Sequence, residues 1–342
     1  MMLGNFQEVT NSSWKAGVMA SADEEPKVSV VILTKNSAQT ISRSIESALA
    51  QSRPPDEVLI VDGSSVDGTK DILGKYPVRI VEEPGLGFGH ARNVGLNNAS
   101  GDVIFFLDSD CYAELLWIDN ALKALQDPEI SAVTGPTLLW NKESMVARFL
   151  AFVRDRVEVS KESRLVAIAP TMNLALRKSV IQRIGMFDPT LVRGEDTDLT
   201  YRISRKEKIL WDPNVRIWFK GSPTFWKASR KCVNHFIGMG QLFAKHGFKK
   251  LFVSSLLPIR GILLILTIAS ALLGAWPLAP GMAAVLLFDL TYKIVKMALK
   301  YRDSCIIYYL VFFTWWSLTS LAVFWGFFLG RSKAYKKINS VL

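Results

Sequence analysis

Short apolar runs alternate with amphipathic segments through the first two thirds of the chain. The runs are rich in Val and Ile and have the length of buried strands, and they lie at 28–34, 57–62, 78–81, 104–108, 130–134 and 171–177. The segments between them repeat apolar residues every three or four positions, which predicts helices near 41–49, 72–73, 91–96, 115–125, 144–159 and 179–185. This alternation predicts an α/β fold with a doubly wound, mostly parallel sheet.

Carboxylates end two of the predicted strands. Asp62 closes the second run, and Asp108 and Asp110 end the stretch Ile104-Phe-Phe-Leu-Asp-Ser-Asp110. The C-terminal edge of an open α/β sheet is where ligands bind. Two carboxylates a few ångströms apart repel each other, and a divalent cation that also binds a diphosphate relieves the repulsion with oxygen ligands. A strand followed by an acidic helix cap explains the same pattern without a metal.

A glycine-rich segment precedes the third predicted helix. Gly85, Gly87 and Gly89 are suited to cradle a phosphate, but their spacing is not the dinucleotide-binding pattern, and a plain flexible loop fits equally well. Arg92, just after the loop, is a candidate contact for a diphosphate or a base. We expect His90 to be a solvated residue at the start of the helix.

A second acidic stretch follows Gly194. Glu195, Asp196 and Asp198 are three acids within four residues, and a helix is predicted to begin there. Acids in the first turn of a helix interact favourably with its dipole, so the stretch taken alone is equally compatible with a structural role.

Charge and hydrophobicity are distributed unevenly. The net charge is +10, but the chain from Lys227 onward holds fifteen Lys or Arg and two acids, which leaves about −3 for the part before it. A basic, apolar C-terminal third indicates a membrane with anionic lipid. Nucleic acid would explain the charge but not the apolar runs, so we expect no nucleic-acid partner. The three cysteines are far apart and give neither a disulfide framework nor zinc spacing.

The sequence predicts four parts. They are a flexible tail at 1–26, a catalytic domain at 27–224, an interfacial amphipathic helix at 225–250 and a helical transmembrane region with a basic tail at 251–342. The apolar segments of the last part are 256–276, 282–297 and 306–329. Basic residues at 300–302 and 331–337 belong in the cytosol by the positive-inside rule, which conflicts with three simple crossings. We therefore expect two or three spans.

Four segments in order resemble the motifs of glycosyltransferase family 2. They are Val28-Ser-Val-Val-Ile-Leu-Thr-Lys-Asn36, Val61-Asp-Gly-Ser-Ser-Val-Asp-Gly-Thr69, Ala91-Arg-Asn-Val-Gly95 and Leu107-Asp-Ser-Asp110. The resemblance covers residues 28 to about 220. It implies a GT-A fold and inverting chemistry on nucleotide sugars.

The resemblance also implies roles for individual residues. The donor site would consist of Thr34, Asn36, Asp62, Arg92 and Asp108. Asp108 and Asp110 would hold the divalent cation, Mn²⁺ or Mg²⁺, together with the diphosphate. Asp196 would be the general base on the acceptor hydroxyl, and Glu195 would orient the acceptor.

Two positions depart from the family pattern. Leu33 stands where Pro is more common, which affects the strand end and not the chemistry. Phe219 stands where many members have a His that helps to hold the metal, so the third protein ligand is in doubt. Activity that persisted in a strong chelator would exclude the metal.

We therefore expect a multi-pass cell-membrane enzyme with a cytosolic catalytic domain. It would transfer a sugar, with UDP as the expected nucleotide, to a lipid-linked glycan beside anionic headgroups, in a setting compatible with a complex of membrane glycan enzymes. A polyprenyl or dolichyl phosphate acceptor is the enzymatic alternative. A catalytically inactive nucleotide-sugar-binding scaffold is an alternative of another class. A processive synthase and a nicotinamide oxidoreductase lack their motifs.

Overall fold

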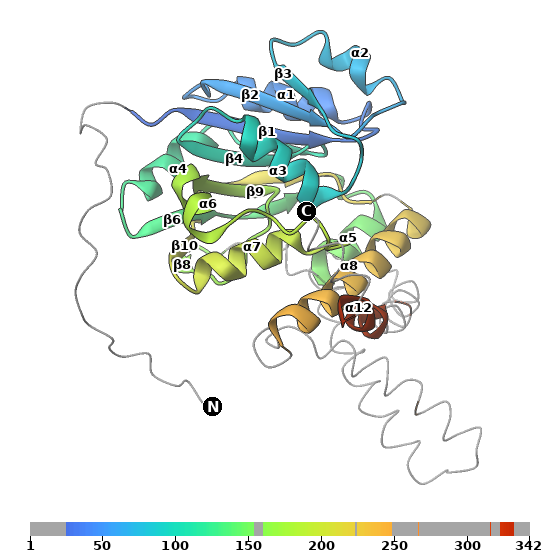
Figure 1. Ribbon diagram of the computed structural model, residues 1–342. Coiled ribbons are helices and arrows are strands. Elements are labelled where there is room, and N and C mark those ends of the chain that lie inside the picture. The colour runs from blue at the N-terminus through green and yellow to red at the C-terminus, as the bar shows by residue number, and fades with distance from the viewer. Residues whose placement is uncertain are drawn as a thin grey trace, which may run out of the picture.

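A large mixed sheet forms the centre of the structure (Figure 1). The computed structural model describes residues 25–153, 160–222, 224–247 and 322–331, and the single residues 266 and 315. In this part of the chain the sheet has eight strands, in the spatial order β3 (Arg79–Glu82), β2 (Glu57–Asp62), β1 (Val28–Thr34), β4 (Val103–Asp108), β9 (Asn173–Arg177), β6 (Ile130–Thr134), β10 (Lys208–Trp211) and β8 (Arg164–Leu165). Every predicted strand up to β9 is present within two residues of its expected bounds.

The pairing of the strands is mostly parallel. Strand β1 lies between β2 and β4 and is parallel to both, β3 is parallel to β2, and β6 is parallel to β10. Strand β9 is antiparallel to β4 and β6 and separates the two parallel blocks, and β8 is antiparallel to β10. The predicted α/β fold with a mostly parallel sheet is confirmed.

Helices cover both faces of the sheet (Figure 1). They are α1 (Ile41–Leu49), α2 (Thr69–Leu73), α3 (Phe88–Asn98), α4 (Trp117–Leu125), α6 (Lys178–Ile184) and α7 (Glu195–Ser204). Val30 and Ile32 of β1 pack with α1 and α4 in one core, and Val31 packs with α3, α6 and α7 in the other. Strand β1 is buried along its whole length, which fits a sequence that is apolar except at Ser29 and Thr34.

A second sheet lies beside the first core and was not predicted. Its strands are β5 (Cys111–Ala113), β11 (Ile217–Phe219) and β7 (Thr137–Leu139), with β11 in the middle. Strand β11 follows a turn over residues 213–215. Strands β5, β7, β8 and β10 have two to four residues, too few for a periodic pattern to show.

Asn173 connects the two sheets through a buried set of hydrogen bonds. Its Oδ1 accepts from Trp117 Nε1 at 2.8 Å, and its Nδ2 donates to the carbonyls of Val215 at 2.8 Å and Pro136 at 3.2 Å. The side chain of Asn173 is fully buried. The amide thus joins β9, α4 and the segments that lead into β7 and β11.

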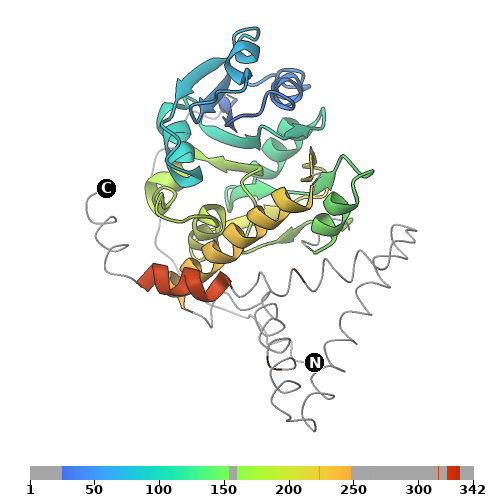
Figure 2. The same cartoon turned by 90° about the vertical axis from the view of Figure 1, so that its right-hand side faces the viewer.

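The helix α8 (Phe225–His246) lies within the range 225–250 predicted as an interfacial amphipathic helix, and its place at a membrane interface stays a prediction. Its buried face, which includes Ala228, Cys232 and Phe236, packs against α5 (Met145–Val153) and α12 (Ala322–Arg331). Both views show α8 and α12 side by side (Figure 2). The apolar face of this basic helix is therefore occupied by protein. Residues 154–159 of the helix predicted at 144–159 lie outside the described residues.

The contact between α8 and α12 depends on glycine. A Cβ on Gly240 of α8 would overlap the backbone oxygen of Val323, and one on Gly326 of α12 would overlap the backbone oxygen of Ile237. The two backbones touch directly at this crossing.

The three predicted apolar segments lie outside the described residues, apart from Leu266, Trp315 and α12. Among the residues that the structure describes, no helix has both the length and the apolar character needed to cross a bilayer. The number of spans stays a prediction.

Replacing Asn173 with Leu is expected to destabilise the protein by about 3 kcal/mol. The substitution leaves the Trp117 indole N–H and the Val215 carbonyl buried without their partner, at roughly 1–3 kcal/mol each. Urea or thermal unfolding of the full chain measures the loss. Asn120→Leu, which removes one partly exposed hydrogen bond to the Asn214 carbonyl, is the control and should cost less than 1 kcal/mol. Equal stability of the two variants would contradict the role of Asn173.

Candidate active site

Three predicted site residues meet at the C-terminal edge of the sheet. Thr34 ends β1, Asp62 ends β2 and Asp108 ends β4. Thr34 is paired with Asp62 in the β1–β2 register, and Leu33 is paired with Asp108 in the β1–β4 register. Since the strands are parallel and adjacent, the three side chains come to one edge.

Asp62 and Asn36 hold the loop that follows β2. Asp62 is fully buried, and its two carboxylate oxygens accept from the backbone N–H of Ser65 at 3.1 Å and from the Ser65 hydroxyl at 2.5 Å. Asn36 has a left-handed backbone with φ 52°, and its Oδ1 accepts from the Val66 N–H at 2.9 Å. Both residues therefore shape the wall of the edge, and their contact with a nucleotide stays a prediction.

Buried Glu83 organises the glycine-rich loop. Its carboxylate accepts from the N–H groups of Gly85 and Leu86, both at 2.8 Å, and lies 2.7 Å from Nδ1 of His90. The expectation that His90 is simply solvated was wrong, because the ring is tied to Glu83. The sequence signal for this role of Glu83 was its position directly before Pro84, where the loop begins.

Arg92 is the buried cation of the site. It lies on α3, is 4% exposed, and forms a close ion pair with Glu195 of α7, which is 3% exposed. Its other terminal nitrogen lies 3.7 Å from Oδ1 of Asp108. One guanidinium therefore links α3, β4 and α7, although Arg92 and Glu195 are 103 positions apart in the sequence.

Carboxylates crowd the edge around Arg92. Partial burial raises the pKa of Asp108, and the nearby charges of Asp110 and Asp196 raise it further, against the opposing effect of Arg92. Burial and Asp196 also raise the pKa of Glu195, while Arg92 lowers it. Burial by itself would lower the pKa of Arg92, but the acids around it raise that pKa, so the guanidinium stays charged. The site carries more negative than positive charge.

Asp196 occupies the first turn of α7. The turn begins at Gly194, which has φ 88°, and the side chain of Asp196 is half-buried. Its Oδ1 accepts from the backbone N–H of Thr197 at 2.7 Å. The carboxylate of Asp196 is therefore partly exposed to solvent and lies at the positive end of the dipole of α7.

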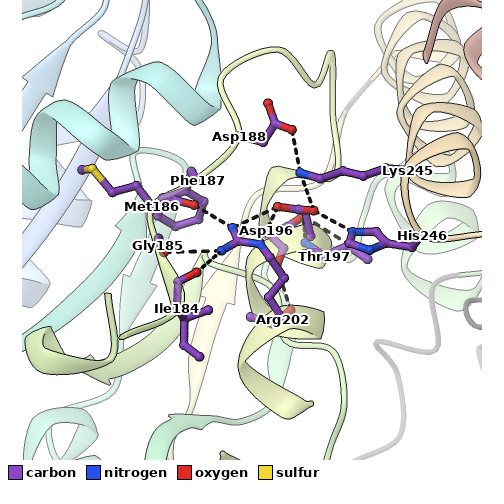
Figure 3. Close-up of polar contacts among 12 residues, drawn as sticks. Ile184, Gly185, Met186, Phe187, Asp188, Asp196, Thr197, Arg202, Lys245 and His246 are labelled. Atoms are coloured by element: carbon purple, nitrogen blue, oxygen red, sulfur yellow. Dashed lines mark hydrogen bonds and ion pairs between the residues drawn. The ribbon is translucent and has the colours of Figure 1, made fainter. Parts of the chain in front are cut away.

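Figure 3 shows Arg202 of α7, Lys245 and His246 at the end of α8, and the polar contacts around them. Asp198, the third acid of the stretch, joins α7 to the end of α8. This fully buried carboxylate lies 2.9 Å from Nζ of Lys245, 2.7 Å from Nε2 of His246 and 2.9 Å from Nη2 of Arg202. Lys245 also contacts Asp188 at 2.6 Å. Although its burial opposes ionisation, these partners lower the pKa of Asp198 far below its usual range.

Helix α8 also holds the segment before Glu195. Buried Gln241 accepts from the N–H of Val192 at 2.9 Å through its Oε1. A Cβ on Gly238 would overlap the carbonyl of Arg193, so the two backbones touch. The loop that carries the acidic pair is thus fixed against α8. Sequence reasoning missed this because Gln241, Lys245 and His246 belong to no motif.

The carboxylates of Asp108 and Asp110 have the chemistry that a hard divalent cation prefers. Asp108 and Asp110 supply carboxylate oxygens, and their mutual repulsion is the property that a cation would relieve. Within the described residues, no three or more His, Cys, Asp or Glu side chains are grouped closely enough to hold a metal. Phe219 is buried between β5 and β7 in the second sheet, so it contributes no ligand.

Some buried polar atoms of the site have no hydrogen-bond partner in the described part of the protein. They include Thr34 Oγ1, Arg92 Nε and Glu195 Oε2. Buried polar atoms are nearly always satisfied, so unsatisfied ones gathered at a sheet edge indicate a place where a polar ligand binds. All three belong to residues predicted for the site.

Comparison with known proteins gives a family match over the first part of the chain. Residues 29–185 match the family model described as Glycosyl transferase family 2. The chain is similar to glycosyltransferase AglE of Haloferax volcanii, at 30% identity over 187 residues, which cover 52% of this chain and 61% of that protein. It is also similar to the succinoglycan biosynthesis protein ExoO of Rhizobium meliloti, at 44% identity over 192 residues, which cover 51% and 54%. The chain spans less than two thirds of the length of these curated relatives.

A solved structure shares the fold. The mannosyltransferase PcManGT of Pyrobaculum calidifontis, in complex with GDP-Man and Mn²⁺, superposes with a TM-score of 0.58 at 20% identity. The match covers 91% of this chain and 89% of that protein. The fold is therefore GT-A-like.

Replacing Arg92 with Met should destabilise the protein by roughly 3–5 kcal/mol, because Glu195 is left buried without its cation. The double variant Arg92→Met/Glu195→Leu removes both charges and should recover part of that loss. Thermal unfolding of the full chain compares them. A single variant as stable as the wild type would show that the pair does not hold α3 to α7.

The ion pairs of Asp198 should make stability depend on pH at the acid end. Because the folded-state pKa is lowered, the contribution is complete above the unfolded-state pKa of about 3.9 and is lost as the pH falls below it. The difference in unfolding temperature between wild type and Asp198→Asn should therefore shrink from pH 7 to pH 3. Asp71→Asn on the exposed side of α2 is the matched control. A difference for Asp198→Asn that stays constant with pH would contradict this role.

Proposed function

Because residues 29–185 form a family 2 glycosyltransferase domain with a GT-A-like fold, we propose that the chain transfers a sugar from a nucleoside diphosphate to an acceptor hydroxyl with inversion. The observation that carries the proposal is the ion pairing of Arg92 with both Asp108, at 3.7 Å, and Glu195, which brings together at one sheet edge the segments that carry Asp108, Asp110 and Asp196. Two of these carboxylates serve the diphosphate, and the third serves the acceptor. They come from different halves of the domain.

Asp196 acts as the general base. A hydroxyl is a poor nucleophile, so a carboxylate within hydrogen-bond reach takes its proton as the new bond forms at the anomeric carbon. The bond from that carbon to the diphosphate breaks in the same displacement, and its electron pair leaves with the nucleoside diphosphate. One displacement inverts the anomeric centre and needs no enzyme nucleophile.

The other site residues bind and position. Thr34, Asn36 and Asp62 line the donor side of the edge, and Arg92 holds Asp108 near Glu195. Glu195 keeps one oxygen on Arg92, and its unsatisfied Oε2 is the atom we assign to the acceptor. The buried charge of Arg92 also offsets part of the negative charge that develops on the diphosphate.

Asp108 and Asp110 are the residues that would hold Mn²⁺ or Mg²⁺. When bound, such an ion stabilises the charge on the leaving diphosphate. The fold neighbour that contains GDP-Man and Mn²⁺ supports this assignment. With Phe219 in place of a His ligand, either water would complete the coordination or the metal would bind more weakly.

We further propose a UDP-sugar donor and a lipid-linked glycan acceptor at the cytosolic face of the cell membrane. The basic C-terminal third with its apolar segments supports membrane anchoring, as do the exposed Lys227, Arg230 and Lys231 on α8. The relative named for succinoglycan biosynthesis supports a glycan product. A polyprenyl phosphate acceptor is the alternative, and its product would be a single sugar on a lipid phosphate, released by mild acid.

Native membranes with the full chain and a panel of nucleotide sugars test the proposal. We expect the wild type to use one donor, Asp196→Asn and Asp110→Asn to lose at least a hundredfold in transfer, and strong chelator to abolish it. The Asp71→Asn variant should keep full activity.

Two results would overturn parts of the proposal. Donor binding without turnover in the wild type would favour the inactive scaffold and remove the role of Asp196. Transfer that persists in strong chelator would remove the metal but leave the base.

A further inference from the structure

The outer face of the second sheet carries a cluster of aromatic side chains. Tyr112 of β5 and Trp218 of β11 are opposite each other in the register, with ring centroids 6.2 Å apart and planes within 7°. Trp140, directly after β7, packs edge-on to Tyr112 at 5.9 Å. The neighbouring residues Cys111 and Phe219 point the other way, into the core. All three rings of the outer face remain partly exposed.

Three cations lie over these rings. Cζ of Arg43 is 3.8 Å from the Tyr112 centroid and 4.1 Å from the Trp140 centroid. Nζ of Lys142 is 5.4 Å from the Trp218 ring, and Nζ of Lys220 is 5.6 Å from the Trp140 ring. We call these six residues the aromatic platform.

The platform holds its cations without neutralising them. In the described part of the chain, no carboxylate forms an ion pair with Arg43, Lys142 or Lys220, whereas cations such as Arg183 and Lys208 are paired with acids. Ring faces attract cations through their quadrupole but leave the net charge in place. Glu114 contacts the platform through Trp218, whose indole N–H donates to the Glu114 carboxylate at 3.0 Å. The platform is therefore a positive surface.

The guanidinium of Arg43 has a defined chemistry. A guanidinium held over ring faces keeps its N–H groups available, and these match the two oxygens of a phosphate or carboxylate. The partly exposed aromatic rings beside it offer apolar surface to the C–H groups of a sugar ring. The combination selects a ligand that has both an oxyanion and a saccharide.

The platform adjoins the Asp108–Asp110 turn. The backbone N–H of Lys220 donates to the Asp110 carbonyl at 2.8 Å, and that of Trp140 donates to the Phe219 carbonyl at 3.0 Å. On the other side, the hydroxyl of Ser44, next to Arg43, donates to the Cys111 carbonyl at 2.5 Å. Lys220 itself and Ser44, the neighbour of Arg43, thus hydrogen-bond to the segment that carries Asp110 and Cys111.

We infer that the aromatic platform is the acceptor subsite and that it binds an oxyanion-bearing saccharide, with the oxyanion on Arg43 and its neighbouring lysines. The inference rests on the proposed transfer reaction, since it names the class of acceptor for the same site. A phosphate- or diphosphate-linked sugar has the required chemistry. A uronic acid has the same charge on a carboxylate, and the test separates the two.

The first test uses binding and does not require turnover. Ligand-observed NMR with the full chain, in excess UDP and GDP to occupy the donor side, compares glucose 1-phosphate, glucuronic acid, inorganic phosphate and methyl α-glucoside. We expect the two charged sugars to bind better than the neutral glycoside or phosphate alone, and the tighter of the two to identify the oxyanion. Equal binding of the neutral glycoside, or a preference for a short oligonucleotide, would overturn the inference.

Variants assign the binding to the platform. Arg43→Gln and Lys142→Gln should each weaken charged-sugar binding by roughly tenfold to a hundredfold, as expected for the loss of a charge-assisted hydrogen bond. Arg43→Lys keeps a charge but not the planar fork and should fall between. Lys208→Gln, which removes one positive charge on β10, is the matched control. Equal weakening in the control would overturn the assignment.

Steady-state kinetics separates this inference from the proposed function. If the chain transfers sugar, Arg43→Gln should raise the acceptor KM about tenfold or more and leave the donor KM and donor hydrolysis within twofold. An unchanged acceptor KM would overturn the platform while the transferase stands. If the wild type shows no turnover, the proposed function fails, and the binding comparison still decides whether the platform takes a charged saccharide.

Discussion

A buried guanidinium at the edge of the sheet determines how the two halves of the domain meet. Removing the charge of Arg92 from water is costly, and the structure compensates with carboxylates from α7 and β4. Those carboxylates come from segments about 100 and 16 positions away along the chain, so the ion pairs form only when α3, β4 and α7 reach their final arrangement. The same condition brings Asp196, the neighbour of Glu195, to the carboxylates after β4. Folding and assembly of the site are in this sense one event.

Much of the fold and of the site could be predicted because each signal was local. An apolar run such as 28–34 is buried on both faces of a parallel sheet, and a carboxylate at its end comes to the edge whatever the rest of the chain does. Asp62 and Asp108 were predictable for this reason, whereas Thr34 was expected on the family resemblance. The elements that were missed depend on distant partners. Strand β5 has three residues and exists because β11, about a hundred positions later, pairs with it.

The same distinction explains why the polar network around the site was not predicted. Nothing next to Gln241, Lys245 or His246 indicates a role, because their partners, Val192 and Asp198, belong to another helix and its preceding loop. His90 and Glu83 are closer in sequence, yet their pairing requires the loop at 84–87 to fold back. The amphipathic pattern predicted a helix at α8, but not which residues it would bury or what would cover them. In the structure those residues pack on protein from α5 and α12.

The way α8 is embedded bears on how the chain could be shortened for laboratory work. The sequence predicts that the catalytic domain ends just before Phe225, so a chain that stops there is a natural choice for crystallisation. Such a fragment would expose Phe149 and Leu191, which pack with α8. It would also remove Lys245 and His246, the partners of Asp198 on α8. The loop bearing the acidic pair would also lose Gln241 and its backing helix. A shortened form of this protein therefore has to retain α8, together with α12 that crosses it, if the loop that carries Glu195 and Asp196 is to keep its native shape.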